Sequence, residues 1–580
     1  MGAGAAPTAG PSRPRTLSSP LLGARHGRAG ARPLRRRGHA WCGLWGNASC
    51  RVGARRAASM IPMPSDESAL PPPAVRHAAP VRGQADHALS VPSGVRLVRN
   101  VLALGIGQVF TLLFSSVLTV LLPRYLGDEK LGKTATAASL TGLCGLLASL
   151  GIGSYLAKEV ARRGPRGHVS VANALATRAP LTAVACLLAL GVAALLGYDP
   201  LTQRLVAIYC LGIVFGSVAG VLVGTLQGLQ EMRWVALGDV VGKALLLAGV
   251  IAVVHGDRGL VALAVVWQLT GLGSIAVYLL PLYRRGALGG QFDRHGWRAL
   301  VTGSLPFFIW QASLMVYGQI DVVLLSIFSH AAVIGWYSAA YRIIGIPLFI
   351  PSIITNVCYP AMSHSAVHNR QSFRALAGRS LHVVLLFSIP MAVGIIVLCG
   401  PLLSFFRYPH EFQNSIPLII ILALHVPLVG VDLIVGTALN ALDRQRAWAL
   451  TGVAAAVLNP AVNMLFIPVF ERYLQNGAVG ATIVTVLTEV FMMLMGLRLL
   501  RGEVFDRSSL VVGLKCLVAA LVMAGAVWLL RELFLPFTVL AGACVYFALS
   551  FVLGTVSLRD LRLLRAYMLH RAHPRVTAAV

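Results

Sequence analysis

The 580-residue sequence predicts an all-α polytopic membrane protein with about fourteen transmembrane helices: two pseudo-repeated six-helix lobes and two extra C-terminal helices. The first observation is composition. Only 12% of the residues are charged and the mean hydropathy is +0.75, whereas soluble domains carry about 25% charged residues. The second observation is a series of apolar runs of about 20 residues, the length that crosses a hydrocarbon core about 30 Å thick. The third is an internal repeat of about two hundred residues.

The apolar runs place the helices along the chain. The expected spans are about 101–122, 134–156, 178–197, 204–226, 234–254, 259–282, 304–328, 332–358, 380–400, 416–440, 447–469, 478–500, 510–530 and 535–557. They define an N-lobe of six helices over 97–285, a C-lobe of six over 297–503 and a final helix pair over 508–557. We expect a disordered tail over 1–96, rich in Arg, Pro and Gly without apolar periodicity, and a basic tail over 558–580.

The net charge of +28 follows from membrane topology. With the N-terminus in the cytoplasm, 38 of the 49 basic residues fall in inner segments, 8 in outer loops and three within spans. Cytoplasmic loops collect Lys and Arg in membrane proteins. We therefore expect both termini to be cytoplasmic, and the basic excess gives no support for a nucleic-acid partner.

Two pairs of similar segments reveal the repeat. The segment LLPRYLGDEKLGKTATA (121–137) matches LLSIFSHAAVIGWYSAA (324–340) at an offset of 203, and LQGLQEMR (226–233) matches LNALDRQR (439–446) at an offset of 213. Both pairs lie at equivalent helix ends. Because each repeat contains an even number of spans, the lobes are expected to be parallel repeats with the substrate path between them.

Charged residues inside spans are costly and usually face a cavity or a partner. Asp239 and Lys243 lie four residues apart on one helix, where they can pair with each other, or Lys243 can instead receive an anionic headgroup. Asp321 and Arg342 lie at similar depths on adjacent spans, which makes an ion pair between them plausible. Glu489 lies near mid-span without an obvious local partner.

The motifs of several enzyme classes are absent from the sequence. No phosphate-binding loop occurs, no cysteine or histidine spacing fits a metal site, and no outer loop is large enough for catalysis. We therefore expect a protein that is not an enzyme, with no catalytic residues, no metal and no cofactor.

Several segments resemble the Wzx-type oligosaccharide flippase family, also described as polysaccharide biosynthesis proteins, of the multidrug/oligosaccharidyl-lipid/polysaccharide (MOP) exporter superfamily. The similarity covers about residues 97–500. It is carried most specifically by IDVVLLS and YSAAYR, within 317–328 and 333–343, with support from LNALDRQR and from GAVGATIVTVLTE at 477–489.

The resemblance implies a flippase that moves a polyprenyl-diphosphate-linked oligosaccharide across the plasma (inner) membrane by alternating access. Its implied partners are that lipid-linked glycan, membrane lipids and polysaccharide polymerase or glycosyltransferase machinery. Charged residues of the spans then become candidate site residues. The candidates for substrate binding are Lys243, Arg342, Arg178 and Asp321, and the candidates for binding a coupling ion are Glu489, Asp239 and Asp432.

Three other functions remain open at this point. A lipid II flippase and a multidrug or small-solute antiporter belong to the same superfamily, although the antiporters typically have twelve spans. A membrane-embedded polysaccharide polymerase or ligase belongs to another class and would need a large outer loop.

Overall fold

The computed structural model describes residues 93–164, 170–289 and 293–555. The predicted basic tail over 558–580 lies outside the described residues, and so does residue range 1–92 of the predicted N-terminal tail. Residues 93–96 are helical, so the first helix begins four residues before the predicted end of the tail.

All regular secondary structure in the described residues is helical, which confirms the predicted fold class. The N-lobe contains α1 (Ser93–Ser149), α2 (Ile152–Arg163), α3 (Val171–Leu195), α4 (Pro200–Gly228), α5 (Met232–His255) and α6 (Gly259–Arg284). The C-lobe contains α7 (Arg294–Phe328), α8 (Ala331–Gly345), α9 (Phe349–His368), α10 (Arg370–Phe405), η1 (His410–Ser415), α11 (Ile416–Ala423), α12 (His425–Ala441), α13 (Gln445–Leu474) and α14 (Gly477–Leu500). The final pair is α15 (Arg507–Leu529) and α16 (Leu535–Val552).

The described helices account for fourteen membrane crossings. Twelve helical segments are long and apolar enough to span a membrane, and α8 with α9 forms a further span bent by 46°. The first segment, Gly105–Arg163, has 59 residues, which at 1.5 Å per residue is about 88 Å, far more than one crossing needs. It breaks at Gly127, whose φ of 70° is not helical, so this segment crosses twice.

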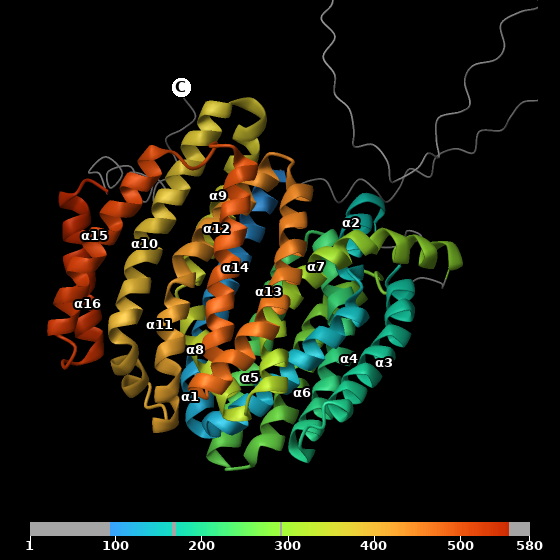
Figure 1. Ribbon diagram of the computed structural model, residues 1–580. Coiled ribbons are helices and arrows are strands. Elements are labelled where there is room, and N and C mark those ends of the chain that lie inside the picture. Colours follow the sequence, from blue (N-terminus) through green and yellow to red (C-terminus); the bar gives the residue numbers. More distant parts are fainter. Residues whose placement is uncertain (1–92, 165–169, 290–292, 556–580) are drawn as a thin grey trace, which may run out of the picture. The chain divides into compact units, whose positions relative to one another are not determined.

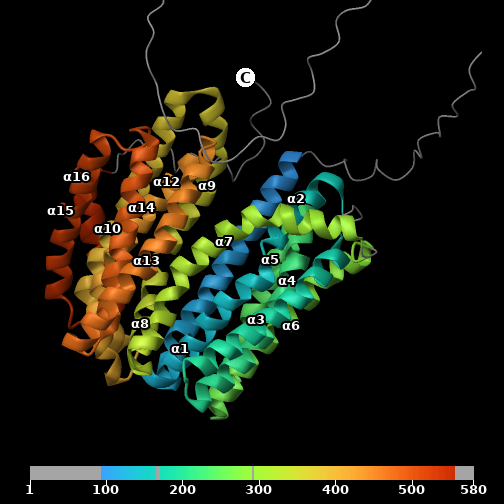
Figure 2. The same ribbon diagram turned by 45° about the vertical axis from the view of Figure 1, so that its right-hand side comes forward.

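Apolar packing differs between the two ends of the helix bundle, which we call the Gly127 end and the Ser93 end. One buried cluster joins N-lobe leucines such as Leu122 and Leu131 to C-lobe residues such as Ile334 and Phe412 at the Gly127 end. Near the Ser93 end, buried residues form smaller clusters: one lies within the C-lobe, one lies within the N-lobe, and one joins α2, α3 and α4 to Leu300 of α7. The largest core that the lobes share therefore lies at the Gly127 end, where α1 and α8 lie side by side (Figures 1 and 2).

Two glycines form a reciprocal backbone contact at the Gly127 end. A Cβ atom on Gly132 would lie 1.8 Å from the carbonyl oxygen of Ala331, and one on Gly335 would lie 2.0 Å from that of Asp128. Adding the repeat offset of 203 to Asp128 and Gly132 gives Ala331 and Gly335. Each lobe therefore presents the same helical segment to the other, and only glycine permits this close approach.

The second repeated segment is confirmed by its hydrogen bonds. The amide of Glu231 donates to the carbonyl of Leu226 over 2.9 Å, and the amide of Arg444 donates to Leu439 over 2.8 Å. These residues correspond at the offset of 213. Gln230 and Asp443, which also correspond, both have positive φ. The two helices therefore end in the same way, as the sequence similarity predicted.

The last two helices, α15 and α16, pack beside α10 at the edge of the C-lobe (Figure 1). The hydroxyl of Tyr546 donates to the backbone carbonyl of Leu386 over 2.8 Å. The ammonium of Lys515, one of the three in-span basic residues, donates to the carbonyl of Leu553 over 2.8 Å. Lys515 therefore serves the packing of this pair.

Glu503, between α14 and α15, links this segment to the first turns of α10. Glu503 accepts hydrogen bonds from Arg370, at 2.9 Å and 3.1 Å, and from Arg374, at 2.7 Å and 3.2 Å. The bonds from Arg374 and then Arg370 lower the pKa of Glu503 to about 2. The link joins the start of α10 to the segment that leads into α15.

We predict that Gly132→Ala shifts the protein away from the arrangement closed at the Gly127 end. The added methyl group must displace backbone, and overpacking of this kind costs about 1–3 kcal/mol, or about 5- to 150-fold in the ratio of closed to open molecules. The measurement is disulfide cross-linking between cysteines placed at Tyr198 and Ser326, whose hydroxyls are 2.5 Å apart in the closed end. Gly318→Ala is the control, because its Cβ atom would meet nothing within 4 Å. Equal cross-linking in both variants would contradict the prediction.

We predict that Glu503→Gln removes a stabilising contribution that depends on pH. The folded-state pKa lies below the ordinary value of 4.5, so the contribution is present above about pH 4.5 and is lost as the pH falls toward 2. Both arginines are about half exposed, so we expect an effect within about 1 kcal/mol. Thermal unfolding of the two proteins should differ at pH 7 and converge in acid. A constant difference at all pH values would refute this assignment.

Candidate functional site

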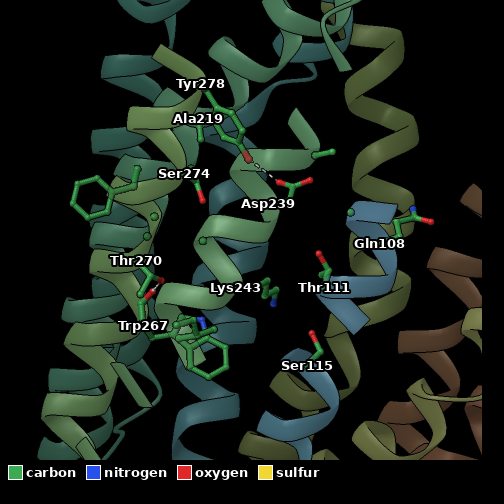
Figure 3. Close-up of a pocket in the computed structure, with 18 of the residues that line it drawn as sticks. Gln108, Thr111, Ser115, Ala219, Asp239, Lys243, Trp267, Thr270, Ser274 and Tyr278 are labelled. Carbon is green, nitrogen blue, oxygen red and sulfur yellow. Dashed lines mark hydrogen bonds between the residues drawn. The ribbon is translucent and has the colours of Figure 1, made fainter. Parts of the chain in front are cut away.

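A cavity of about 770 Å³ lies between the N-lobe and α9 of the C-lobe. This volume falls within the range of about 300–1,000 Å³ typical of small-molecule sites. Helices α1, α4, α5 and α6 form most of its wall, and Phe349 and Ser352 of α9 complete it. Its polar lining residues, most of them labelled in Figure 3, are Gln108, Thr111, Ser115, Asp239, Lys243, Gln268, Thr270, Ser274 and Tyr278.

Lys243 is the only basic side chain among the described residues that line this cavity. It extends from α5 toward the helix that carries Thr111 and Ser115 (Figure 3). Its neighbour Asp239 accepts a hydrogen bond of 2.6 Å from the hydroxyl of Tyr278. Among the described residues no ion pair joins Asp239 to Lys243, so the ammonium is left for another partner.

Arg342 on α8 is a second cation without a counter-ion among the described residues. Its Nε atom is buried and has no hydrogen-bond partner. The charged or phenolic groups that act on it electrostatically are Tyr209, Tyr408 and Lys243. Arg342 does not line the main cavity, but it lies near enough to Lys243 for the two positive charges to interact. Together they favour an anion.

Arg178 is held in the wall of the N-lobe. Its guanidinium donates to the backbone carbonyl of Ser217 over 2.6 Å and to that of Ser149 over 3.0 Å. It therefore links α3 to α4 and to the end of α1. Its Nε atom has no partner in the described structure. Arg178 lines a second, smaller cavity.

Asp321 lies inside the C-lobe rather than beside the main cavity. Its carboxylate accepts hydrogen bonds from the hydroxyl of Tyr337 at 2.8 Å, the amide of Asn463 at 2.8 Å and the hydroxyl of Thr485 at 3.2 Å. The plausible ion pair with Arg342 is wrong, since no such pair occurs among the described residues. Three neutral donors satisfy the carboxylate instead.

Glu489 has partners that sequence reasoning missed. The hydroxyl of Tyr317 donates to its carboxyl group, and the Nδ1 atom of His425 lies 3.8 Å away. Asp432 is also buried, and neither of its carboxyl oxygens has a hydrogen-bond partner among the described residues. Its carboxyl group interacts electrostatically with that of the buried Glu489, and two buried carboxyl groups that interact do not readily carry two negative charges. Of the three candidates for binding a coupling ion, Glu489 and Asp432 thus lie near each other in the C-lobe, whereas Asp239 lies in the N-lobe.

No group of three or more His, Cys, Asp or Glu side chains able to hold a metal ion occurs in the part of the chain that the structure describes. The candidate functional residues form three separate groups. These are the main cavity with Lys243 and Asp239, the Asp321 network, and the carboxyl pair of Glu489 and Asp432.

Comparison with known proteins identifies relatives of the whole bundle. Residues 97–366 match the family described as polysaccharide biosynthesis protein. A probable flippase, AglR, from Haloferax volcanii is 24% identical over 392 residues, which is 64% of this chain and 77% of the relative. The probable low-salt glycan biosynthesis flippase Agl15 of the same organism is 22% identical over 74% of this chain and 89% of its own length.

Solved structures share the fold. The lipid II flippase MurJ, in an inward closed conformation, aligns with a TM-score of 0.66 at 17% identity over 79% of this chain and 99% of its own. An inward-facing multidrug resistance MATE family transporter of the MOP superfamily aligns with a TM-score of 0.56 at 15% identity over 70% of this chain and 98% of its own. The resemblance seen in the sequence is confirmed by the match of residues 97–366 to the polysaccharide biosynthesis protein family and by the two relatives named as probable flippases.

Proposed function

We propose that this protein is a flippase that moves a polyprenyl-diphosphate-linked oligosaccharide across the plasma membrane for surface polysaccharide biosynthesis. The observation that carries the proposal is the pair of cations Lys243 and Arg342, which form no ion pair among the described residues and lie at or near a cavity of about 770 Å³ between the lobes. A buried, unpaired cation is unfavourable until an anion joins it, and a diphosphate carries the charge that both residues need.

The packing of the lobes supports alternating access. The lobes share their largest apolar core at the Gly127 end, whereas near the Ser93 end a small cluster joins Leu300 of α7 to the N-lobe. If the N-terminus is cytoplasmic, as the distribution of Lys and Arg indicates, the closed end faces outward. The cavity is then on the side from which a cytoplasmic substrate arrives.

The relatives support a glycan flippase over the other functions. Two of them are named as probable flippases, one for glycan biosynthesis. MurJ keeps lipid II flipping as the second candidate, because it shares the fold over most of this chain. A multidrug antiporter is less well supported, since fourteen crossings exceed the twelve typical of that class.

We further propose that the carboxyl pair of Glu489 and Asp432 binds the coupling ion, as a proton shared between the two groups. It is supported by the burial of both groups, by the contacts of Glu489 with Tyr317 and His425, and by the carboxyl oxygens of Asp432, which lack a hydrogen-bond partner in the described structure. Glycosyltransferases that build the glycan and a polymerase that receives it are the partners expected for such a flippase.

Replacement of both Lys243 and Arg342 by alanine should abolish most transport. Hydrogen bonds to charged groups contribute about 1.5–3 kcal/mol, so we expect each single variant to lower the rate at least tenfold. Lys243→Arg should retain activity because it keeps the positive charge. The assay is translocation of a fluorescent polyprenyl-diphosphate trisaccharide in proteoliposomes of the full-length protein.

Lys515→Ala is the matched control, because this in-span lysine bonds to the carbonyl of Leu553 outside the cavity. It should leave the rate within twofold of the wild type. Normal transport by the double alanine variant at equal protein levels would refute the proposed role of the two cations. Absence of transport by the wild-type protein would refute the proposed substrate.

A further inference from the structure

A second cavity of about 390 Å³ lies inside the N-lobe, next to the main cavity. Four lining residues are common to both cavities, namely Gly212, Gly216, Trp267 and Gln268. The smaller cavity is therefore a side chamber of the main one, separated from it by residues of α4 and α6.

Glycines create the space in this side chamber. Gly142 and Gly145 of α1 and Gly212 and Gly216 of α4 line it, and a Cβ atom on Gly216 would meet nothing within 4 Å. Protein interiors are normally packed as densely as organic crystals. Gly145 and Gly216 leave room that larger side chains would fill, whereas Gly142 and Gly212 let the side chains of Met315 and Gln268 approach closely.

Two buried donor atoms of residues that line the chamber lack partners. The Nε atom of Arg178 and the Nε2 atom of Gln268 have no hydrogen-bond partner in the described structure. The two residues are only 4% and 8% exposed. An unsatisfied buried donor costs about 1–3 kcal/mol, and more when it belongs to a charged group. A ligand that accepts hydrogen bonds from both would recover that cost.

The chemistry of the wall selects an anion. Arg178 forms no ion pair among the described residues, and no Asp or Glu lines the chamber. The aromatic rings of Tyr209 and Trp267 form further parts of the wall. Aromatic surface with a few convergent polar groups is typical of a small-molecule site. Each hydroxyl of a neutral sugar brings a donor as well as acceptors, whereas a carboxylate brings acceptors only and a negative charge.

We propose that the side chamber is a subsite for a carboxylate-bearing sugar, such as a uronic acid, of the transported oligosaccharide. The sugar carboxylate accepts a hydrogen bond from Gln268 near the positive charge of Arg178, a ring hydroxyl accepts from Arg178 Nε, and the ring of the sugar lies against Trp267 or Tyr209. This inference rests on the proposed function and specifies which glycans the protein prefers.

The test compares two probes on the full-length protein in lipid nanodiscs. One is a farnesyl-diphosphate-linked disaccharide that ends in glucuronic acid, and the other ends in glucose. We expect the wild type to bind the glucuronosyl probe at least tenfold more tightly. Gln268→Leu should reduce this preference to less than threefold, and it should fold normally because it removes an unpaired buried amide. Gly145→Leu, which fills the chamber, should have the same effect.

Gly191→Leu is the control for the glycine variant, because its Cβ atom also meets nothing within 4 Å but lies on an exposed face of α3. It should keep the tenfold preference. Equal binding of the two probes to the wild type would overturn the subsite and leave the proposed function intact. A preference that survives in well-folded Gln268→Leu and Gly145→Leu proteins would also overturn it. Failure of the wild type to bind either probe would overturn both proposals.

Discussion

The reciprocal contact of Gly132 and Gly335 is the constraint on which the rest of the bundle depends. Each glycine lets the backbone of its lobe reach the other lobe, at Ala331 and Asp128. The indole of Trp336 reinforces the contact by donating to the carboxylate of Asp128 over 2.9 Å. Backbone atoms make this contact, so the two lobes approach each other most closely at the Gly127 end. The main cavity lies between the N-lobe and α9 of the C-lobe.

The basic residues within and at the ends of the spans differ in how their charge is satisfied. Lys515 and Arg178 donate to backbone carbonyls of neighbouring helices, which is a structural use of a cation at a helix junction. Lys243 and Arg342 have no such acceptor among the described residues. The cost of a cation in a membrane interior is high, so a position that leaves it unpaired beside a polar cavity indicates binding of an anion rather than packing.

Much of the fold could be predicted from the sequence, because the length and apolar composition of a segment are enough to identify a membrane span. The repeat could also be predicted from the sequence, because the segment around Gly132 recurs around Gly335 at an offset of 203. The partners of the buried carboxylates could not be predicted. Similar depth on adjacent spans suggested that Asp321 meets Arg342, but depth says nothing about rotation around the helix axis. The partners of Glu489 and the glycine-lined chamber lie on helices distant in sequence, and only packing brings them together.

The two lobes divide the chemistry, and α7 connects them. The N-lobe forms most of the wall of the main cavity and all of the side chamber, whereas the buried Asp321, Asp432 and Glu489 lie in the C-lobe. On α7, the side chain of Gln319 accepts a hydrogen bond of 2.7 Å from Ser139 of α1, and Tyr317, two residues away, donates to Glu489 of α14. A proton lost or gained at Glu489 changes the hydrogen bond of Tyr317 and therefore acts on the helix that also contacts the N-lobe. If the carboxyl pair binds the coupling ion, α7 is the element through which its protonation biases the relative positions of the lobes.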